Sequence, residues 1–175
     1  MMNCNELKDE MLNSIVNAKA WDEISLEFNL TGEMLEHYVD KLNWKLVSRN
    51  SNIQWTVRLV EKWADRLDWE ELSYCDNKYL LTPDVIAYFI NRWNWLKLSG
   101  NTSIVLDNLF IDRFVDHWDW SELIGRYRDG IFSTKFYERY KKYIPVNDFL
   151  DDSHLLRAMQ DEALERIKEE LTKQC

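Results

Sequence analysis

Residues 69–95 read WEELSYCDNKYLLTPDVIAYFINRWNW, and this stretch holds the pattern that decides the fold. It begins and ends on a tryptophan, and tryptophans recur along the chain at steps of 23, 25, 26 and 25 residues: Trp21, Trp44, Trp69, Trp95 and Trp120. A fixed period between about 20 and 50 residues is typical of arrays whose units cannot bury their apolar faces without neighbours. The sequence therefore predicts five repeats over residues 21–145.

Each repeat is predicted to contain two helices. Short polar residues precede four of the five tryptophans, and their side chains can accept bonds from the first-turn amides of a helix: Asn43, Asp68, Asn94 and Asp119. The tryptophan then opens a short helix that reads W-x-x-[ILV]-S in four repeats.

A second helix start lies thirteen residues before each following tryptophan. The cap residues there are Thr31, Thr56, Thr82 and Asp107, with Ser133 at the same offset from Val146. Behind each cap, apolar residues recur at i, i+1, i+4 and i+8, which is one face of a helix. The predicted long helices cover 32–43, 57–67, 83–93, 108–118 and 134–143.

Both ends depart from the repeat, as terminal units of an array do. Residues 5–20 are predicted to form an N-terminal helix, and residues 146–175 a C-terminal capping helix, most clearly over 152–172. The predicted fold class is all-α: an α-solenoid-like stack, right- or left-handed, of about five two-helix repeats with N- and C-terminal capping helices. We expect residues 1–175 to form a single domain.

Composition limits the classes of partner. The net charge of −9 disfavours general attraction to nucleic acid or to anionic membranes. Three scattered cysteines, Cys4, Cys75 and Cys175, favour a reducing compartment over a disulfide framework. The start lacks the apolar segment of a secretory signal, and the longest apolar run, residues 85–90, is too short to span a bilayer. We therefore expect a cytoplasmic protein with no membrane association.

The repeat resembles short Trp-marked helical repeats of W-x-x-[IL]-S-x-N type found in uncharacterised proteins of large viruses, phages and bacteria. Asn50 and Asn101 match the last position of that motif, whereas Glu27, Cys75 and Arg126 do not. The resemblance covers about residues 21–145 and implies a stacked helical array in a viral or mobile-element setting. It implies no activity.

No catalytic or cofactor motif stands out. His37, His117 and His154 lie in separate segments, and neither H-E-x-x-H, a P-loop, G-x-S-x-G nor G-x-G-x-x-G occurs. We predict a chain that is not an enzyme and holds no metal or cofactor.

Two functional hypotheses lead. In the first, the array is an adaptor or inhibitor that binds a protein partner through exposed long-helix positions: Lys62, Tyr88, Arg113 and Arg139. In the second, the chain inhibits a nucleic-acid-binding enzyme by presenting the carboxylates of Asp40, Asp65 and Asp116 as a phosphate mimic. The identity of the partner and the choice between monomer and homodimer stay open.

Direct nucleic-acid binding is a third hypothesis. The last repeat gathers cations that could contact phosphates, interleaved with tyrosines: Arg126, Arg128, Lys135, Arg139, Lys141 and Lys142. The simpler interpretation is that this basic run pairs with the acidic C-terminal segment. The tryptophan ladder could likewise stack on bases, but its helical register favours core packing. Among the tryptophans, Trp55 is the candidate for such stacking, because the other repeats carry Leu or Phe at its position.

Overall fold

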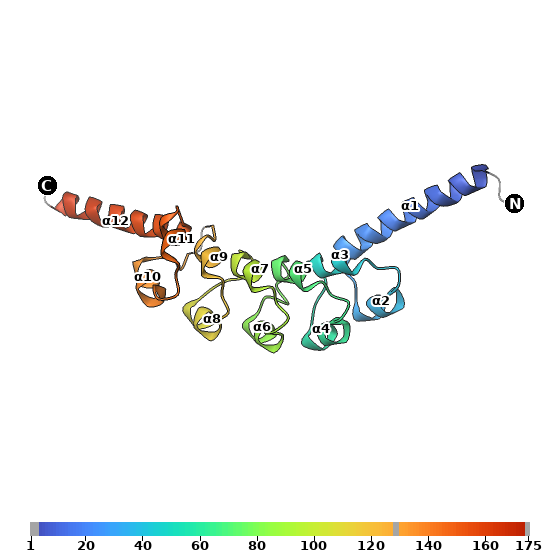
Figure 1. Ribbon diagram of the computed structural model, residues 1–175, viewed down its shortest axis with the longest axis horizontal. Helices are drawn as coiled ribbons and strands as arrows, with labels where there is room; N and C mark the ends of the chain where they lie inside the picture. Colours follow the sequence, from blue (N-terminus) through green and yellow to red (C-terminus); the bar gives the residue numbers. More distant parts are fainter. Residues whose placement is uncertain (1–3, 128–129, 174–175) are drawn as a thin grey trace. The chain divides into compact units, whose positions relative to one another are not determined.

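The computed structural model describes residues 4–127 and 130–173 (Figure 1). Every regular element in this part of the chain is an α-helix, which confirms the all-α class. The chain divides into two compact units, Met1–Trp93 and Asn94–Cys175, and each is described by itself. The expectation of a single domain stays a prediction.

The first unit contains six helices among its described residues. They are α1 (Cys4–Glu27), α2 (Gly32–His37), α3 (Trp44–Arg49), α4 (Val57–Trp63), α5 (Trp69–Tyr74) and α6 (Pro83–Tyr88). The helices α2, α4 and α6 form one row, here called the cap row, while the C-terminal end of α1, α3 and α5 form a second, the Trp row (Figure 1). Within the Trp row α1 contacts α3, and α3 contacts α5. Successive repeats therefore stack, as predicted.

The second unit repeats this arrangement and ends in a longer helix. Its helices are α7 (Trp95–Gly100), α8 (Asn108–Arg113), α9 (Trp120–Ile124), α10 (Thr134–Tyr140), α11 (Val146–Leu150) and α12 (His154–Lys173). The Trp row of this unit is α7, α9 and α11, and its cap row is α8 and α10 (Figure 1). The long helix α12 packs on α10 and α11. It covers the end of the stack, as a capping helix should.

The caps that begin the helices are confirmed in both rows. Each side-chain oxygen accepts a bond from a first-turn amide in the cap row, at Thr31, Thr56, Thr82, Asp107 and Ser133. The same holds in the Trp row for Asn43, Asp68, Asn94 and Asp119.

The serine of the W-x-x-[ILV]-S signature joins one repeat to the next. Ser48 Oγ donates to the carbonyl of Trp44 (2.7 Å) and accepts the amide of Asp68 in the next repeat (2.9 Å). Ser25 and Ser99 accept the amides of Asn43 and Asp119 in the same way, at 3.0 and 2.9 Å. These serines are fully buried, so a hydroxyl at this position satisfies an amide that water cannot reach.

Buried asparagines form a second link. Asn50 Nδ2 donates to the carbonyls of Ser25 (3.0 Å) and Phe28 (2.9 Å) in the preceding repeat. In the third repeat Asn77 makes the equivalent link, because its Nδ2 donates to the carbonyls of Asn50 (3.1 Å) and Ile53 (2.9 Å). The motif expects this asparagine at residue 75, which is a cysteine. Asn77 lies two residues further along, so the motif alone does not identify it.

The five marker tryptophans pack against one aromatic column of the cap row. The ring centroids lie 4.7 to 5.6 Å apart in the pairs Trp21–Tyr38, Trp44–Trp63, Trp69–Phe89, Trp95–Phe114 and Trp120–Tyr140. The indole nitrogens of Trp44, Trp69 and Trp120 donate to carbonyls five residues earlier. Four of the markers are half-buried, and Trp120 is buried, as is Trp55. The rings therefore join the two helices of each repeat.

The cap-row helices are shorter than predicted. Their starts agree with the sequence, but they end at residues 37, 63, 88, 113 and 140 instead of 43, 67, 93, 118 and 143. Just beyond the ends of α2, α4 and α8, the carbonyls of Val39, Ala64 and Val115 accept indole protons from the marker tryptophans. In the last turns of α6 and α8, the carbonyls of Ile86 and Ile111 accept the indoles of Trp93 and Trp118, both at 3.1 Å. The apolar residues keep their helical spacing in the turns that follow these helices, so periodicity alone predicts helices that are too long.

Both terminal segments also differ from the prediction in detail. The N-terminal helix continues through Trp21 to Glu27, because Ala20 precedes Trp21 where the other repeats have a capping residue. The C-terminal segment splits into α11 and α12 around Asp152, whose φ is 61°.

Candidate interaction surfaces

The predicted partner-binding positions lie at equivalent places near the ends of α4, α6, α8 and α10, and all four side chains are exposed: Lys62, Tyr88, Arg113 and Arg139. Three of them contact a carboxylate of the preceding repeat. Lys62 pairs with Glu36, the hydroxyl of Tyr88 donates to Glu61, and Arg139 pairs with Asp112. This outer edge of the cap row thus combines contacts between repeats with exposure to solvent. Binding of a partner there stays a prediction.

The three contacts differ in charge. Lys62–Glu36 and Arg139–Asp112 are ion pairs, and the hydrogen bond from Arg139 lowers the pKa of Asp112. In the middle pair the hydrogen bond to Glu61 raises the pKa of Tyr88, so the phenol stays neutral. No lysine or arginine of the described residues lies within ion-pair distance (4.0 Å) of Glu61.

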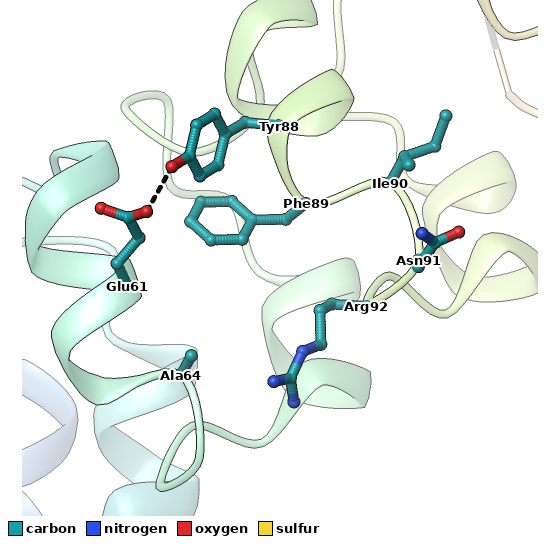
Figure 2. A pocket seen from close by; sticks show the side chains of 7 residues that line it. All are labelled: Glu61, Ala64, Tyr88, Phe89, Ile90, Asn91 and Arg92. Atoms are coloured by element: carbon teal, nitrogen blue, oxygen red, sulfur yellow. Dashed lines mark hydrogen bonds between the residues drawn. The ribbon is translucent and has the colours of Figure 1, made fainter.

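A pocket of about 420 Å³ opens beside the Glu61–Tyr88 pair (Figure 2). Its lining comes from the end of α4 and from the end of α6 with the turn that follows it: Glu61, Ala64, Tyr88, Phe89, Ile90, Asn91 and Arg92. Figure 2 shows the carboxylate and the rings of Tyr88 and Phe89 on one side of it, with Arg92 below. Other repeats carry Val39, Ile90 and Val115 at the position of Ala64, so the small residue leaves the space open.

Two of the three aspartates proposed to mimic phosphates face arginines of the following repeat. Arg66 lies 3.8 Å from Asp40, and Arg92 lies 3.3 Å from Asp65. The same guanidinium groups lie over the rings of Trp44 and Trp69, at 5.8 and 5.9 Å from the ring centroids. Each of these carboxylates therefore has a cation beside it.

The predicted phosphate-contacting residues of the last repeat do not form one exposed patch. Arg126 is 3% exposed and donates to the carbonyl of Ile104, and Arg128 lies outside the described residues. Lys141 is 2.7 Å from Glu138, and Lys142 lies over the ring of Tyr143. Lys135 is exposed and faces Glu162 of α12, whose pKa is lowered first by hydrogen bonds from Thr134 and then by this lysine. In this unit the start of α10 therefore meets a carboxylate of α12.

An apolar stripe on α1 is exposed to solvent. Met11, Leu12, Ile15 and Val16 are each between 54% and 63% exposed, and every residue from Glu10 to Ala20 is exposed. By helical periodicity the stripe lies on a different face from Trp21 and Ser25, which join α1 to the stack. A shorter stripe on α12 consists of Leu164, Ile167 and Leu171. The amphipathic pattern of residues 5–19 signalled a helix, but it could not show which face stays bare.

The three histidines contact rings and not one another: His37 with Tyr38, His117 with Trp95 and His154 with Tyr127. Among the described residues no three His, Cys, Asp or Glu side chains gather closely enough to hold a metal ion. None of the helices in the described ranges is long and apolar enough to cross a membrane.

Comparisons with protein-family models, with curated proteins and with solved structures find no match to this chain.

Proposed function

We propose that this chain is a non-catalytic protein-binding module, an adaptor or an inhibitor, whose partner covers residues 10–20 of α1. The observation that carries the proposal is the bare apolar stripe of Met11, Leu12, Ile15 and Val16. Large contiguous apolar patches on protein surfaces mark interaction sites, and these four side chains follow one another on one face of a helix.

The stability of isolated helices supports the same conclusion. The segment from Glu10 to Ala20 has no buried or half-buried residue. In proteins most of the stability of a helix comes from packing of its amphipathic face and not from helix propensity. A partner that packs on the stripe would supply the burial that the stack itself does not provide, at about 25 cal/mol for each Å² of apolar surface removed from water.

The two alternatives have less support. Phosphate mimicry needs unpaired carboxylates, and Arg66 and Arg92 lie beside Asp40 and Asp65. Direct nucleic-acid binding needs an exposed basic surface, and Arg126 is buried while Arg139 and Lys141 pair with carboxylates.

Affinity capture with matched variants tests the proposal. The wild-type chain and the variant Leu12→Glu/Ile15→Glu are immobilised and exposed to lysate of the native host, and the bound proteins are identified by mass spectrometry. Val105→Glu/Leu109→Glu is the control, because Val105 and Leu109 are 89% and 80% exposed on another surface. We expect a protein that the wild type and the control retain and that the α1 variant loses. Equal retention by all three would contradict the proposal.

Salt separates the proposal from phosphate mimicry. Binding to an apolar stripe should survive about 0.5 M salt, because exposed charges are screened at that ionic strength and apolar contacts are not. A partner that is released by this salt and also binds DNA would favour mimicry instead. Loss of binding on changing Arg139 and Lys142, with a steep salt dependence, would favour nucleic acid.

A further inference from the structure

The pocket between α4 and α6 differs from its equivalents in two residues. In the pairs Glu36–Lys62 and Asp112–Arg139 a cation of the following repeat neutralises the carboxylate. At Glu61 the corresponding residue is Tyr88, which donates a hydrogen bond but brings no charge. Beside it, Ala64 stands where the first and fourth repeats have valine. The contact that lacks the cation, between Glu61 and Tyr88, therefore also has the space to admit one.

The charges around the pocket leave a negative excess. Arg92 also lines the pocket, but it lies 3.3 Å from Asp65 and over the ring of Trp69. The two carboxylates of Glu61 and Asp65 together with the guanidinium of Arg92 carry a net charge of −1. An incoming cation therefore meets a carboxylate that no internal cation neutralises.

The aromatic lining suits the same kind of group. Figure 2 shows the ring of Phe89 below that of Tyr88, with the Glu61 carboxylate beside them. Lysine and arginine bury an aliphatic stem against apolar surface and keep the charged group at a polar site. A cation within about 6 Å of an aromatic ring gains further attraction, and a carboxylate accepts its N–H bonds.

We propose that this pocket receives a lysine or arginine side chain of a protein partner, with its charged group at Glu61 and its stem against Phe89. The incoming group takes the place that Lys62 and Arg139 occupy at the equivalent carboxylates. The source of the side chain rests on the proposed role in protein binding, whereas the site itself is a property of this pocket and is testable without any partner.

A titration with amino-acid amides tests the site. The 15N-labelled chain is titrated with N-acetyl-lysine methylamide and N-acetyl-arginine methylamide, and the shifts of the backbone amides of residues 88–92 are followed by NMR. N-acetyl-norleucine methylamide is the uncharged control ligand. From the size of the ligand we expect a dissociation constant on the order of 1 mM for at least one cation. The norleucine compound should bind at least about tenfold more weakly.

Three variants and one matched control locate the binding. Glu61→Gln removes the charge, Tyr88→Lys supplies an internal cation as at Lys62, and Ala64→Val fills the space with the residue of the first and fourth repeats. Each of these variants should weaken binding of the cationic ligand at least about tenfold. Glu36→Gln changes the carboxylate that is already paired with Lys62, and it should leave the dissociation constant unchanged. Glu61 is exposed, so Glu61→Gln keeps the fold, and thermal unfolding verifies this for all four variants.

The proposal is overturned if neither cation shifts these amides, if norleucine binds as tightly, or if Glu61→Gln binds like the wild type. These outcomes do not involve α1, so failure here and failure of the capture experiment at Leu12 and Ile15 are distinguishable.

Discussion

The two rows of helices differ in the contacts that join one repeat to the next. In the Trp row, serine and asparagine make buried bonds to the backbone, with equivalent pairs at Ser48–Asp68 and Ser99–Asp119. At the edge of the cap row, Lys62 and Arg139 form ion pairs with a carboxylate of the preceding repeat, whereas the uncharged phenol of Tyr88 donates a hydrogen bond to the carboxylate of Glu61.

The difference follows from solvent. A buried amide or carbonyl left without a partner costs about 1–3 kcal/mol, so side chains that bond to the backbone recur at the buried positions of the Trp row. An exposed charge pair contributes about 0–1 kcal/mol, so the edge residues can change without loss of the stack. The Trp row therefore fixes the architecture, whereas the edge of the cap row and residues 10–20 of α1 are free to vary without loss of the stack.

The largest effect should come from removing a buried ring that joins the rows. Trp118 is 5% exposed, packs against Trp95, Phe110 and Phe114, and donates to the carbonyl of Ile111. We expect Trp118→Ala to lower the free energy of unfolding by about 3–5 kcal/mol, because it leaves a cavity. Urea denaturation followed by circular dichroism measures this. A loss below about 1 kcal/mol would mean that the rings do not hold the rows together.

The next effect tests the buried asparagine. Asn77→Leu removes two donors to carbonyls of the preceding repeat and the acceptor for the amide of Tyr79. We expect a loss of about 2–4 kcal/mol in the same urea experiment, since the backbone groups left behind are shielded from water. Asn52→Ala, which removes an exposed bond to the carbonyl of Glu27, should cost less than about 0.5 kcal/mol. Equal losses in the two variants would remove the distinction between buried and exposed links.

A buried thiol in the Trp row gives a pH-dependent effect. Burial raises the pKa of Cys75 from its ordinary 9.0 to about 11. The unfolded chain therefore loses this proton first as the pH rises, so the contribution of Cys75 is intact below pH 9 and is lost between pH 9 and 11. The size is about 2–3 kcal/mol at the upper end. Stability curves of the wild type and Cys75→Ala should converge or cross over this interval, and parallel curves would contradict the prediction.

The smallest effect is expected in the exposed segment of α1, residues 10–20. Leu12→Gln/Ile15→Gln should change the free energy of unfolding by less than about 0.5 kcal/mol, because both side chains are already exposed. Hydrogen exchange of residues 10–20 should be fast in the chain alone and slow once a partner is bound. A large loss of stability in this variant would show that the stripe is packed within the chain itself.

Much of the repeat could be predicted from local signals. The capping residues at Thr31, Thr82 and Asp107 act within their own first turn, so their helix starts agree with the structure. The helix ends could not be predicted, because the indoles that take the carbonyls of Ile86 and Ile111 come from residues beyond the helix. Nothing in the local pattern distinguishes a helical apolar stripe from the same stripe continued in turns.

The candidate sites were less accessible to sequence reasoning. The edge residues Lys62, Tyr88 and Arg139 were singled out as exposed, and they are. Their contacts with carboxylates of the preceding repeat needed the stacking distance, which the sequence does not contain. The pocket at Ala64 was missed for the same reason, since a small residue opens a space only where neighbouring helices fail to fill it.

By itself the sequence determined the period, the helix starts and the aromatic column, because these depend on spacing and on bonds within a few residues. The tertiary structure alone decided which links between repeats are buried and that the apolar residues from Met11 to Val16 stay exposed. It also decided that Asn77 makes the asparagine link that the motif places at residue 75. Those outcomes depend on how closely separate segments approach and exclude water, and segments far apart in sequence settle that only when the chain has folded.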